Sequence, residues 1–461
     1  MLSPPLAPAV PDRSLSERHA VSICVGMVIG AGIFITTPLA AANLPSASWV
    51  LAAWIFGGAM SLAGALCFAE MAAAFPDPGG DYNFLRRAYG DGAGFLFAWS
   101  RFAVIHTGSM ALLAFTFGDY LATLVPLGEH GATLFAAATI IALAAINLAG
   151  LKFGIGTQVW LLWLVLAGML AVIAAGVWLA AGGAPPAPGA ATTAAGPVPQ
   201  FALGAALVYV FLAYGGWSDT ATLSAEMRDA QHGMKRALLA GMGLVTVLYV
   251  LVNWAYLQGL SHVGLARSEA PAADLLFYAF GAPGQALIVA IVALTSITSM
   301  NAIMIAGART TYAAARDTAG LDRLGRWHTV RGTPAPAIVA TAGVALALVA
   351  FGAYTRGGFS TMVDYLSPVY WLFLSLSGIA LLVLRRRYPD VARPFRVPGY
   401  PVVPLVFIAS SLYVLYSSLA YVRIGAVVGV GVLAIGVAML AGLRIMTRLE
   451  SSSRSAAEAR R

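Results

Sequence analysis

Long stretches of apolar residues, separated by short polar segments, run along almost the whole chain of 461 residues. A helix needs about 20 apolar residues to cross the hydrocarbon core of a bilayer, and most of these stretches reach that length. We therefore predict an all-α membrane protein with twelve transmembrane helices. The expected spans lie near residues 19–42, 47–74, 93–125, 131–149, 157–182, 200–224, 237–260, 284–313, 336–354, 363–384, 401–421 and 424–444.

Glycine interrupts two of these apolar stretches at corresponding places. The first, CVGMVIGAGIFITTPLA, breaks at residues 30–32, and the second, LVYVFLAYGGWSDTATL, breaks at residues 215–216. The breaks are 215 − 30 = 185 residues apart, which leaves room for one repeat of five helices. Unwound backbone inside a bilayer is tolerated where it lines a cavity. A matched pair of broken helices therefore indicates the binding site of a secondary transporter.

Composition supports a membrane protein and explains the positive charge. Apolar residues make up 60% of the chain and charged residues only 10%, against about 25% charged in soluble domains. The net charge of +8 could indicate nucleic acid or anionic lipid as a partner. With the N-terminus inside, however, only Arg267, Arg356 and Arg423 among the loop arginines fall on the outer side. This asymmetry predicts both termini in the cytoplasm of a cell-membrane protein, and no nucleic acid partner.

Two repeats of five helices organise the expected fold. An odd number of helices per repeat inverts the second repeat relative to the first, which permits alternating access by rocking one unit against the other. The segments expected along the chain are residues 1–18, a cytoplasmic tail; 19–182, the first repeat; 183–199, an outer Pro/Gly/Ala linker; 200–384, the second repeat; 385–400, a basic cytoplasmic linker; 401–444, peripheral helices 11 and 12; and 445–461, a disordered cytoplasmic tail. The polar loop 75–90 is expected to lie along the cytoplasmic surface.

The first break offers a site for an anion. Unwound backbone exposes N–H groups there, and the half-helix that follows presents its positive N-terminus, so a substrate carboxylate is favoured. Close helix packing through small residues is the alternative. The expected substrate-binding residues are Met27, Val28, Gly30, Ala31 and Gly32.

The second break offers the complementary site. Carbonyl groups freed by the break can accept hydrogen bonds from an ammonium group, and the aromatic rings beside it can form a gate or a cation contact. Plain packing or anchoring at the membrane interface is the alternative for these rings. The expected substrate-binding residues are Phe211, Leu212, Tyr214, Gly215, Gly216 and Asp219, with Trp217 as a gating residue. Carboxylate and ammonium sites on two broken helices together fit an α-amino acid.

Charged residues in or beside the spans are the other candidates. Lys152, one of two lysines in the chain, is either functional or reaches the interface by snorkelling. Asp219 either binds a proton or a cationic side chain, or caps the second half-helix, and we favour the cap. His106 titrates near neutral pH if accessible, although a structural role is favoured, and Arg101 stays ambiguous. The acidic residues in or beside spans are Glu70, Asp119, Asp219, Glu226 and Asp364.

Several chemistries have no support in the sequence. No GxxxxGK[ST], HExxH or CxxC pattern occurs, so ATP-driven transport, metalloprotease activity, a metal and a cofactor are not expected. The two cysteines fall in predicted spans, which makes a disulfide framework unexpected. An intramembrane enzyme would need a nucleophile and a base, and no such pair is evident. A membrane sensor that binds amino acids without moving them stays as an alternative of another class.

Several motifs resemble those of the amino acid–polyamine–organocation (APC) transporters, particularly the L-type amino acid transporter branch and its bacterial permease relatives. These motifs are GMVIGAGIF, GGDYNFLRRAYG, FLAYGGW continuing to SAEM, SMNAIMIAGARTTYAAARD and RPFRVPGYPVVPLVF. The resemblance covers nearly the whole chain. It implies two inverted five-helix repeats with helices 1 and 6 broken, plus two peripheral helices.

The resemblance also implies roles for individual residues. By the family pattern, residues 30–32 bind the substrate carboxylate through backbone N–H groups, and Gly215 with its neighbours receives the ammonium group. Lys152 matches a family lysine in the region where sodium binds in sodium-coupled relatives, which implies sodium-independent transport. Many relatives carry serine at Ala31. A gating phenylalanine usually occupies the position of Leu212, which leaves the identity of the gate open.

A last departure concerns partners. Animal members pair with a heavy subunit through a cysteine in the loop between helices three and four. Here that loop reads VPLGEHGAT, so no disulfide-linked heavy subunit is expected. We expect a sodium-independent permease for L-amino acids, most of all neutral ones, that works as an exchanger or proton-coupled symporter. The alternative within transport is a cationic amino acid or polyamine permease in which Asp219 binds the second amine.

Overall fold

The computed structural model confirms an almost entirely helical protein. It describes residues 17–30, 32–77, 79–150, 155–182, 202–225, 230–316, 323–326, 328, 333–355, 357–421 and 424–458. The α-helices are α1 (Glu17–Val28), α2 (Ile33–Ala41), α3 (Ala47–Ala74), α4 (Asp81–Tyr89), α5 (Asp91–Ser100), α6 (Thr107–Ala122), α7 (Gly131–Leu148), α8 (Ile155–Ala180), α9 (Leu203–Ala213), α10 (Ala230–Arg267), α11 (Pro271–Arg316), α12 (Ala335–Tyr354), α13 (Gly358–Arg387), α14 (Val402–Ala420) and α15 (Ile424–Glu458). A π-helical segment, η1 (Arg101–His106), joins α5 to α6, and a 3₁₀-helix, η2 (Trp217–Ala225), follows α9.

Ten of the described helices are long and apolar enough to cross a membrane, and most match the predicted spans. The pair α1 and α2, bent by 47° at its break, makes an eleventh. α9 together with η2 occupies the place of the remaining predicted span. Twelve spans are therefore consistent with the described part of the chain.

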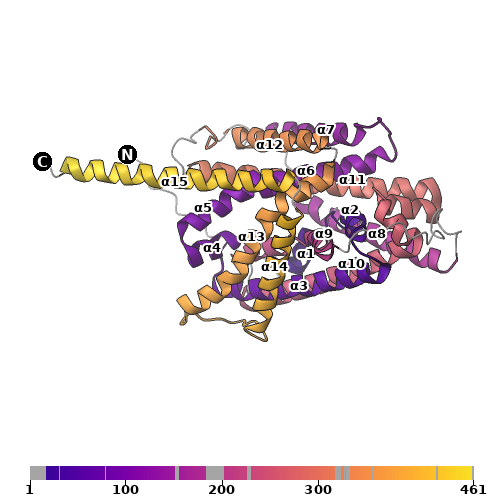
Figure 1. The fold of residues 1–461 in the computed structure, drawn as a ribbon, viewed down its shortest axis with the longest axis horizontal. Coiled ribbons are helices and arrows are strands. Elements are labelled where there is room, and N and C mark those ends of the chain that lie inside the picture. Colours follow the sequence, from indigo (N-terminus) through magenta and orange to yellow (C-terminus); the bar gives the residue numbers. More distant parts are fainter. Residues whose placement is uncertain are drawn as a thin grey trace.

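The two broken spans lie against each other in opposite directions. The first half of one contacts the second half of the other, because α1 packs against η2 and α2 packs against α9. In Figure 1 these short helices lie inside the bundle, with α3, α10, α13 and α14 around them. Crosswise contact is what an inverted pair of helices requires. The boundaries of the two repeats remain a prediction, and the linker 183–199 lies outside the described residues.

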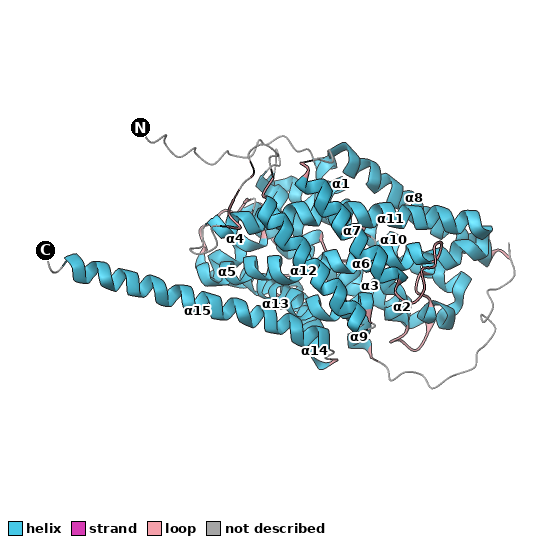
Figure 2. Ribbon diagram, turned by 90° about the horizontal axis from the view of Figure 1, so that it is seen from above, coloured by secondary structure: helices cyan, strands magenta, loops and turns pink. Residues whose placement is uncertain are grey.

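Three helices extend beyond the predicted spans. α10 and α11 each contain a residue with positive φ, Ser261 at 59° and Gly281 at 70°, where the helix direction changes. The prediction that residues 445–461 are disordered was wrong up to Glu458, because α15 continues to that residue and projects beyond the bundle (Figure 2). A span supplies the costly helix nucleus, and the alanine- and glutamate-containing continuation extends it at little cost.

The polar loop 75–90 is more than a surface segment. Its second half forms α4, which packs against α5, α13 and η2. Asp81, Phe84 and Leu85 on this helix are buried, whereas Arg86 pairs with Asp91 at an exposed position. The loop thus closes one end of the bundle next to the second broken helix.

The basic segment after the tenth span is also built into the protein. Glu70 of α3 is buried and accepts hydrogen bonds from Arg385 Nε at 2.7 Å and Nη2 at 2.5 Å. The backbone N–H of Val397 donates to the same carboxylate at 2.7 Å, and Arg393 Nε lies 3.6 Å from it. The Arg385 guanidinium in turn stacks over Tyr400. Residues 385–400 therefore form a strap clamped to α3, because a buried carboxylate needs this many donors.

Candidate functional site

The first break leaves the start of α2 with N–H groups that have no backbone acceptor among the described residues. α1 ends at Val28 and α2 begins at Ile33, with Gly32 in front of it. The N–H groups of Ile33 and Phe34 have no carbonyl within their own helix to bond. Gly30 behaves differently from the prediction, since its N–H donates to Val28 O at 2.9 Å. The available donors are thus those of the α2 N-terminus.

The second break touches the first. Gly216 has φ of +97°, a left-handed conformation that favours glycine, and a side chain there would run into the carbonyl group of Met27. Thr220 Oγ1 also donates to Met27 Sδ at 3.7 Å. Asp219 N–H donates to Gly216 O, so the chain turns directly into η2. Both breaks therefore occupy one place in the bundle.

One side chain from a third helix joins the two breaks. Tyr249 of α10 is fully buried, and its hydroxyl lies 3.0 Å from Val28 O and 3.2 Å from Ala213 O, the last carbonyls of α1 and α9. The hydroxyl donates to these carbonyls, which the breaks have freed. Sequence reasoning missed Tyr249. The only available signal was a tyrosine in mid-span, where a buried hydroxyl requires a partner.

Tyr214 has a packing role in this structure. Its hydroxyl donates to Trp54 O at 2.9 Å, and its ring lies 5.0 Å from that of Tyr249 and 5.7 Å from that of Trp54. All three side chains are fully buried. Tyr214 thus fixes the end of α9 to α3, which matches the packing alternative for this aromatic residue.

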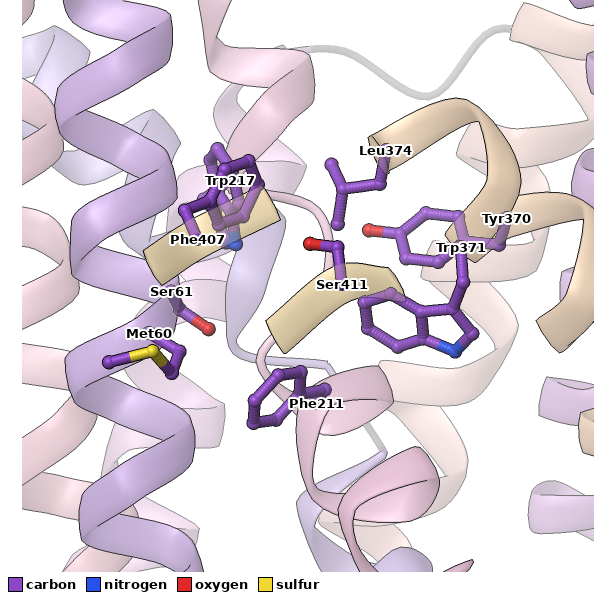
Figure 3. Close-up of a pocket in the computed structure, with 9 residues that line it drawn as sticks. All are labelled: Met60, Ser61, Phe211, Trp217, Tyr370, Trp371, Leu374, Phe407 and Ser411. Atoms are coloured by element: carbon purple, nitrogen blue, oxygen red, sulfur yellow. The ribbon is translucent and has the colours of Figure 1, made fainter. Parts of the chain in front are cut away.

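Phe211 and Trp217 face the opposite side of the broken helix, toward α13 and α14. They line a small pocket with Tyr370, Trp371 and Phe407, shown in Figure 3. Phe211 makes an edge-to-face contact with Trp371, and Trp217 makes such contacts with Phe407 and with Phe68 of α3. The pocket volume of about 10 Å³ holds about one water molecule. An amino acid does not fit there in this conformation.

A larger groove lies on the outside of α9. It has a volume of about 490 Å³ and is lined mainly by apolar side chains of α3, α9 and α14, among them Trp49, Phe56, Phe211 and Tyr413. It adjoins the pocket at Phe211 but does not include the glycines of either break. Leu212, the other expected gating residue, is half-buried.

An ion pair stands beside the second break. Arg101 Nη2 donates to Asp219 Oδ1 at 2.9 Å, across 118 residues of sequence. The same guanidinium places Nε and Nη2 3.3 Å from His106 Nε2. An arginine only donates, so Nε2 must accept and the imidazole is neutral with its proton on Nδ1. The pair disfavours a simple helix cap as the role of Asp219 and gives the ambiguous Arg101 a partner.

Local backbone geometry makes this contact possible. Arg101 and His106 are the first and last residues of η1, a wider π-helical turn inside the third span. Such turns are rare and occur often at functional sites. The sequence contains no signal for them. Two expected site residues, Ala31 and Lys152, lie outside the described residues, and their predicted roles stay predictions.

Comparison with known proteins decides the family. The amino acid permease family matches residues 15–427 of this chain. The chain belongs to the amino acid permease family. It is similar to the b(0,+)-type amino acid transporter 1 of Mus musculus, with 28% identity over 88% of this chain and 82% of that protein.

Two further relatives extend the similarity. The large neutral amino acids transporter small subunit 2 of Rattus norvegicus is 30% identical over 86% of this chain and 74% of its own length. The cystine/glutamate transporter of Homo sapiens is 28% identical over 88% of this chain and 80% of its own length. These matches confirm the resemblance to APC transporters and the prediction of an amino acid transporter.

Proposed function

We propose that this permease moves neutral L-amino acids across the cytoplasmic membrane by alternating access, as a sodium-independent exchanger or proton-coupled symporter. The observation that carries the proposal is the meeting of the two breaks. The α2 N-terminus offers N–H donors for a carboxylate, and the α9 C-terminus offers carbonyl oxygens for an ammonium group. No covalent step is part of the mechanism. In this proposal both termini face the cytoplasm.

The binding residues in this proposal are those of the two breaks. Residues 27–32, with Ala31 among them, receive the carboxylate, and Leu212, Gly215 and Gly216 receive the ammonium group. Met27 is 37% exposed, so the first break is not sealed by protein on the side of α1. Tyr249 holds the two ends at a fixed separation. An α-amino acid, whose carboxylate and ammonium groups are a fixed distance apart, fits between two helix ends held in this way.

The ion pair at Asp219 supports neutral over cationic substrates. In a cationic amino acid or polyamine permease, Asp219 would bind the second amine. Here its carboxylate already accepts from Arg101 at 2.9 Å, and that guanidinium would oppose a second positive charge nearby. One relative's name specifies large neutral amino acids.

The two cysteines and Lys152 bear on the partners of the protein and on its ion coupling. Both cysteines of the chain, Cys24 and Cys67, are buried and free, which supports transport without a disulfide-linked heavy subunit. Lys152 is proposed to replace the sodium ion of sodium-coupled relatives. The role of Lys152 is tested by comparing uptake by Lys152→Ala with uptake by Lys235→Ala.

Flux measurements in proteoliposomes test the proposal. The purified full chain is reconstituted, and uptake of labelled neutral, cationic and acidic amino acids is followed with and without internal amino acid, and with and without an inward proton gradient. Uptake that needs internal amino acid establishes exchange, and gradient-driven uptake into empty vesicles establishes symport. Neither uptake should respond to sodium.

Two results would contradict this function. Transport confined to cationic substrates and abolished by Asp219→Asn would favour the cationic alternative. No flux of any amino acid, together with a ligand-dependent rise in melting temperature, would favour a sensor.

A further inference from the structure

Asp81 is a buried carboxylic acid that the proposed substrate site does not use. It is the first residue of α4, and its exposed fraction is only 7%. Its Oδ1 atom is buried and has no hydrogen-bond partner among the described residues. An ionised carboxylate with one oxygen left without a donor in such a place is strongly disfavoured, so the neutral acid is the favoured form.

The charges around Asp81 lead to the same protonation state. α4 packs against α5, η2 and α13. The groups that act on Asp81 from these sides are Arg101, which directly follows α5, Asp219 of η2 and the phenol of Tyr370 of α13. Arg101 is the one cation among them, and it is bound to Asp219. One positive charge balances one carboxylate, so the second requires a proton.

Within the described part of the chain, the remaining groups near this cluster do not supply another charge. His106 accepts from Arg101 and is therefore neutral. Arg387 of α13 donates to the carbonyls of Arg87 and Ala88 at the other end of α4. Arg86, on the outer face of α4, is paired with Asp91.

We propose that Asp81 is a proton-binding site of this transporter, which holds a proton while Arg101 is paired with Asp219 and releases it to water when Arg101 turns from Asp219 to Asp81. The inference rests on the proposed transport function and names its coupled ion. When Arg101 moves from Asp219 to Asp81, or when water reaches α4, the ionised carboxylate is stabilised, the Asp81 O–H bond breaks and the proton passes to solvent. Because η2 carries Asp219 and belongs to the second broken span, any movement of that span changes the proton affinity of Asp81.

The pKa of Asp81 agrees with this assignment. Burial, followed by the nearby charge of Asp219, raises it from 3.8 to about 8, and Arg101 offsets part of the rise. A raised pKa means that the folded state binds more protons than the unfolded state between these two values. This contribution to stability is therefore fully present near pH 4 and is lost as pH rises toward 8.

The test compares Asp81→Asn with Asp91→Asn in proteoliposomes. Asp91 lies just beyond the other end of α4, and its side chain is 85% exposed, so its replacement is a matched control. A labelled mixture of neutral L-amino acids is the probe. Wild type and Asp91→Asn should take up the mixture when an inward proton gradient is imposed, and exchange should slow at least about threefold from pH 6 to pH 9. Asp81→Asn should retain exchange with a flat pH profile and lose gradient-driven uptake.

An Asp81→Asn protein with the pH profile and gradient-driven uptake of wild type would overturn the inference while leaving amino acid transport intact. Wild-type vesicles that move no amino acid would instead contradict the transport function. The two failures are therefore distinguishable.

A labelling experiment on the wild-type chain keeps the inference testable if the variant does not fold. Hydrophobic carbodiimides modify protonated carboxyl groups in apolar sites. Peptide mass analysis should find Asp81 modified at about pH 6 and protected at about pH 10, two units to either side of its pKa. Asp91 should stay unmodified at both. No modification of Asp81 at about pH 6, or equal modification at both values, would contradict the assignment.

Discussion

The two broken spans solve the same backbone problem with different chemistry. At the first break the chain passes from one α-helix to another across a few small residues, with no charged side chain from Ala20 to Pro45. At the second break an α-helix passes into a 3₁₀-helix that carries Asp219, and this carboxylate is bound to Arg101. The first break offers only backbone groups, whereas the second combines backbone with a charge network.

The two breaks therefore suit different tasks: the first suits recognition of the substrate, and the second suits a response to conformational change. Backbone N–H groups bind a carboxylate whatever side chain the substrate carries, which suits the part common to all amino acids. A charge network on the other broken span changes its energy whenever that span moves. In the proposed function, the first break is therefore the half of the site that is the same for every substrate, and the second is the half that responds to conformation.

Gly216→Ala should have the largest effect, because it puts a side chain where the two breaks touch. The methyl group would meet the Met27 carbonyl, and the left-handed backbone adds about 1–2 kcal/mol. We expect at least about a tenfold loss of exchange in proteoliposomes, with a lower melting temperature. Gly243→Ala on α10, where an added methyl group meets open space, is the control. Wild-type exchange in Gly216→Ala would show that the breaks do not pack as described.

Tyr249→Phe should come next, since it removes the hydroxyl shared by both breaks. The buried Ala213 carbonyl loses this partner, while the Val28 carbonyl keeps the Gly30 N–H, and the loss costs about 1–3 kcal/mol of folding free energy. Thermal unfolding in detergent measures the loss. Tyr256→Phe on the same helix removes a buried hydroxyl that has no partner among the described residues, so its melting temperature should not fall. An equal melting temperature for the two variants would show that the Tyr249 hydroxyl does not stabilise the breaks.

Asp219→Asn should have a moderate effect that is confined to the second break. The Asp219 side chain is 41% exposed and that of Arg101 23%, so the pair contributes about 1 kcal/mol rather than the larger value of a buried pair. Exchange of neutral amino acids should stay within about threefold of wild type. A double-mutant cycle of Asp219→Asn with Arg101→Gln measures the interaction free energy of the ion pair. Complete additivity of the two effects on stability would contradict the pair.

Gly30→Ala should change stability least. An added methyl group at Gly30 meets nothing within 4 Å, and the backbone is not left-handed there. The melting temperature should match wild type, while the KM for amino acid rises several-fold, because the methyl group enters the space in front of α2. A large fall in melting temperature would mean that the first break is as tightly packed as the second, and would remove the contrast between them.

Much of this fold was predictable because bilayers impose simple rules on sequence. Span positions follow from apolar length, and the breaks follow from glycines such as Gly30 and Gly216 inside otherwise apolar segments. The contact between the breaks is the arrangement that the predicted shared substrate site requires, and the site itself stays a prediction.

The rest depends on contacts between residues far apart in the sequence. Tyr249 bonds to carbonyls about 220 and 36 residues away, and nothing in its local sequence indicates either partner. The pairing of Arg101 with Asp219 depends on a π-helical turn that has no sequence signature. Phe211 turned toward α13 and α14, because helical phase near a break cannot be extrapolated from either side.

The strap at residues 385–400 has a mechanical consequence. Separating α3 from α13 at that end would remove the Arg385 and Val397 donors from the buried Glu70 carboxylate. The separation would cost about 3–5 kcal/mol. We therefore expect α3 and α13, together with α14 that follows the strap, to move as one rigid unit during the transport cycle. The hinge must lie elsewhere, at the short half-helices whose joints are made of glycine.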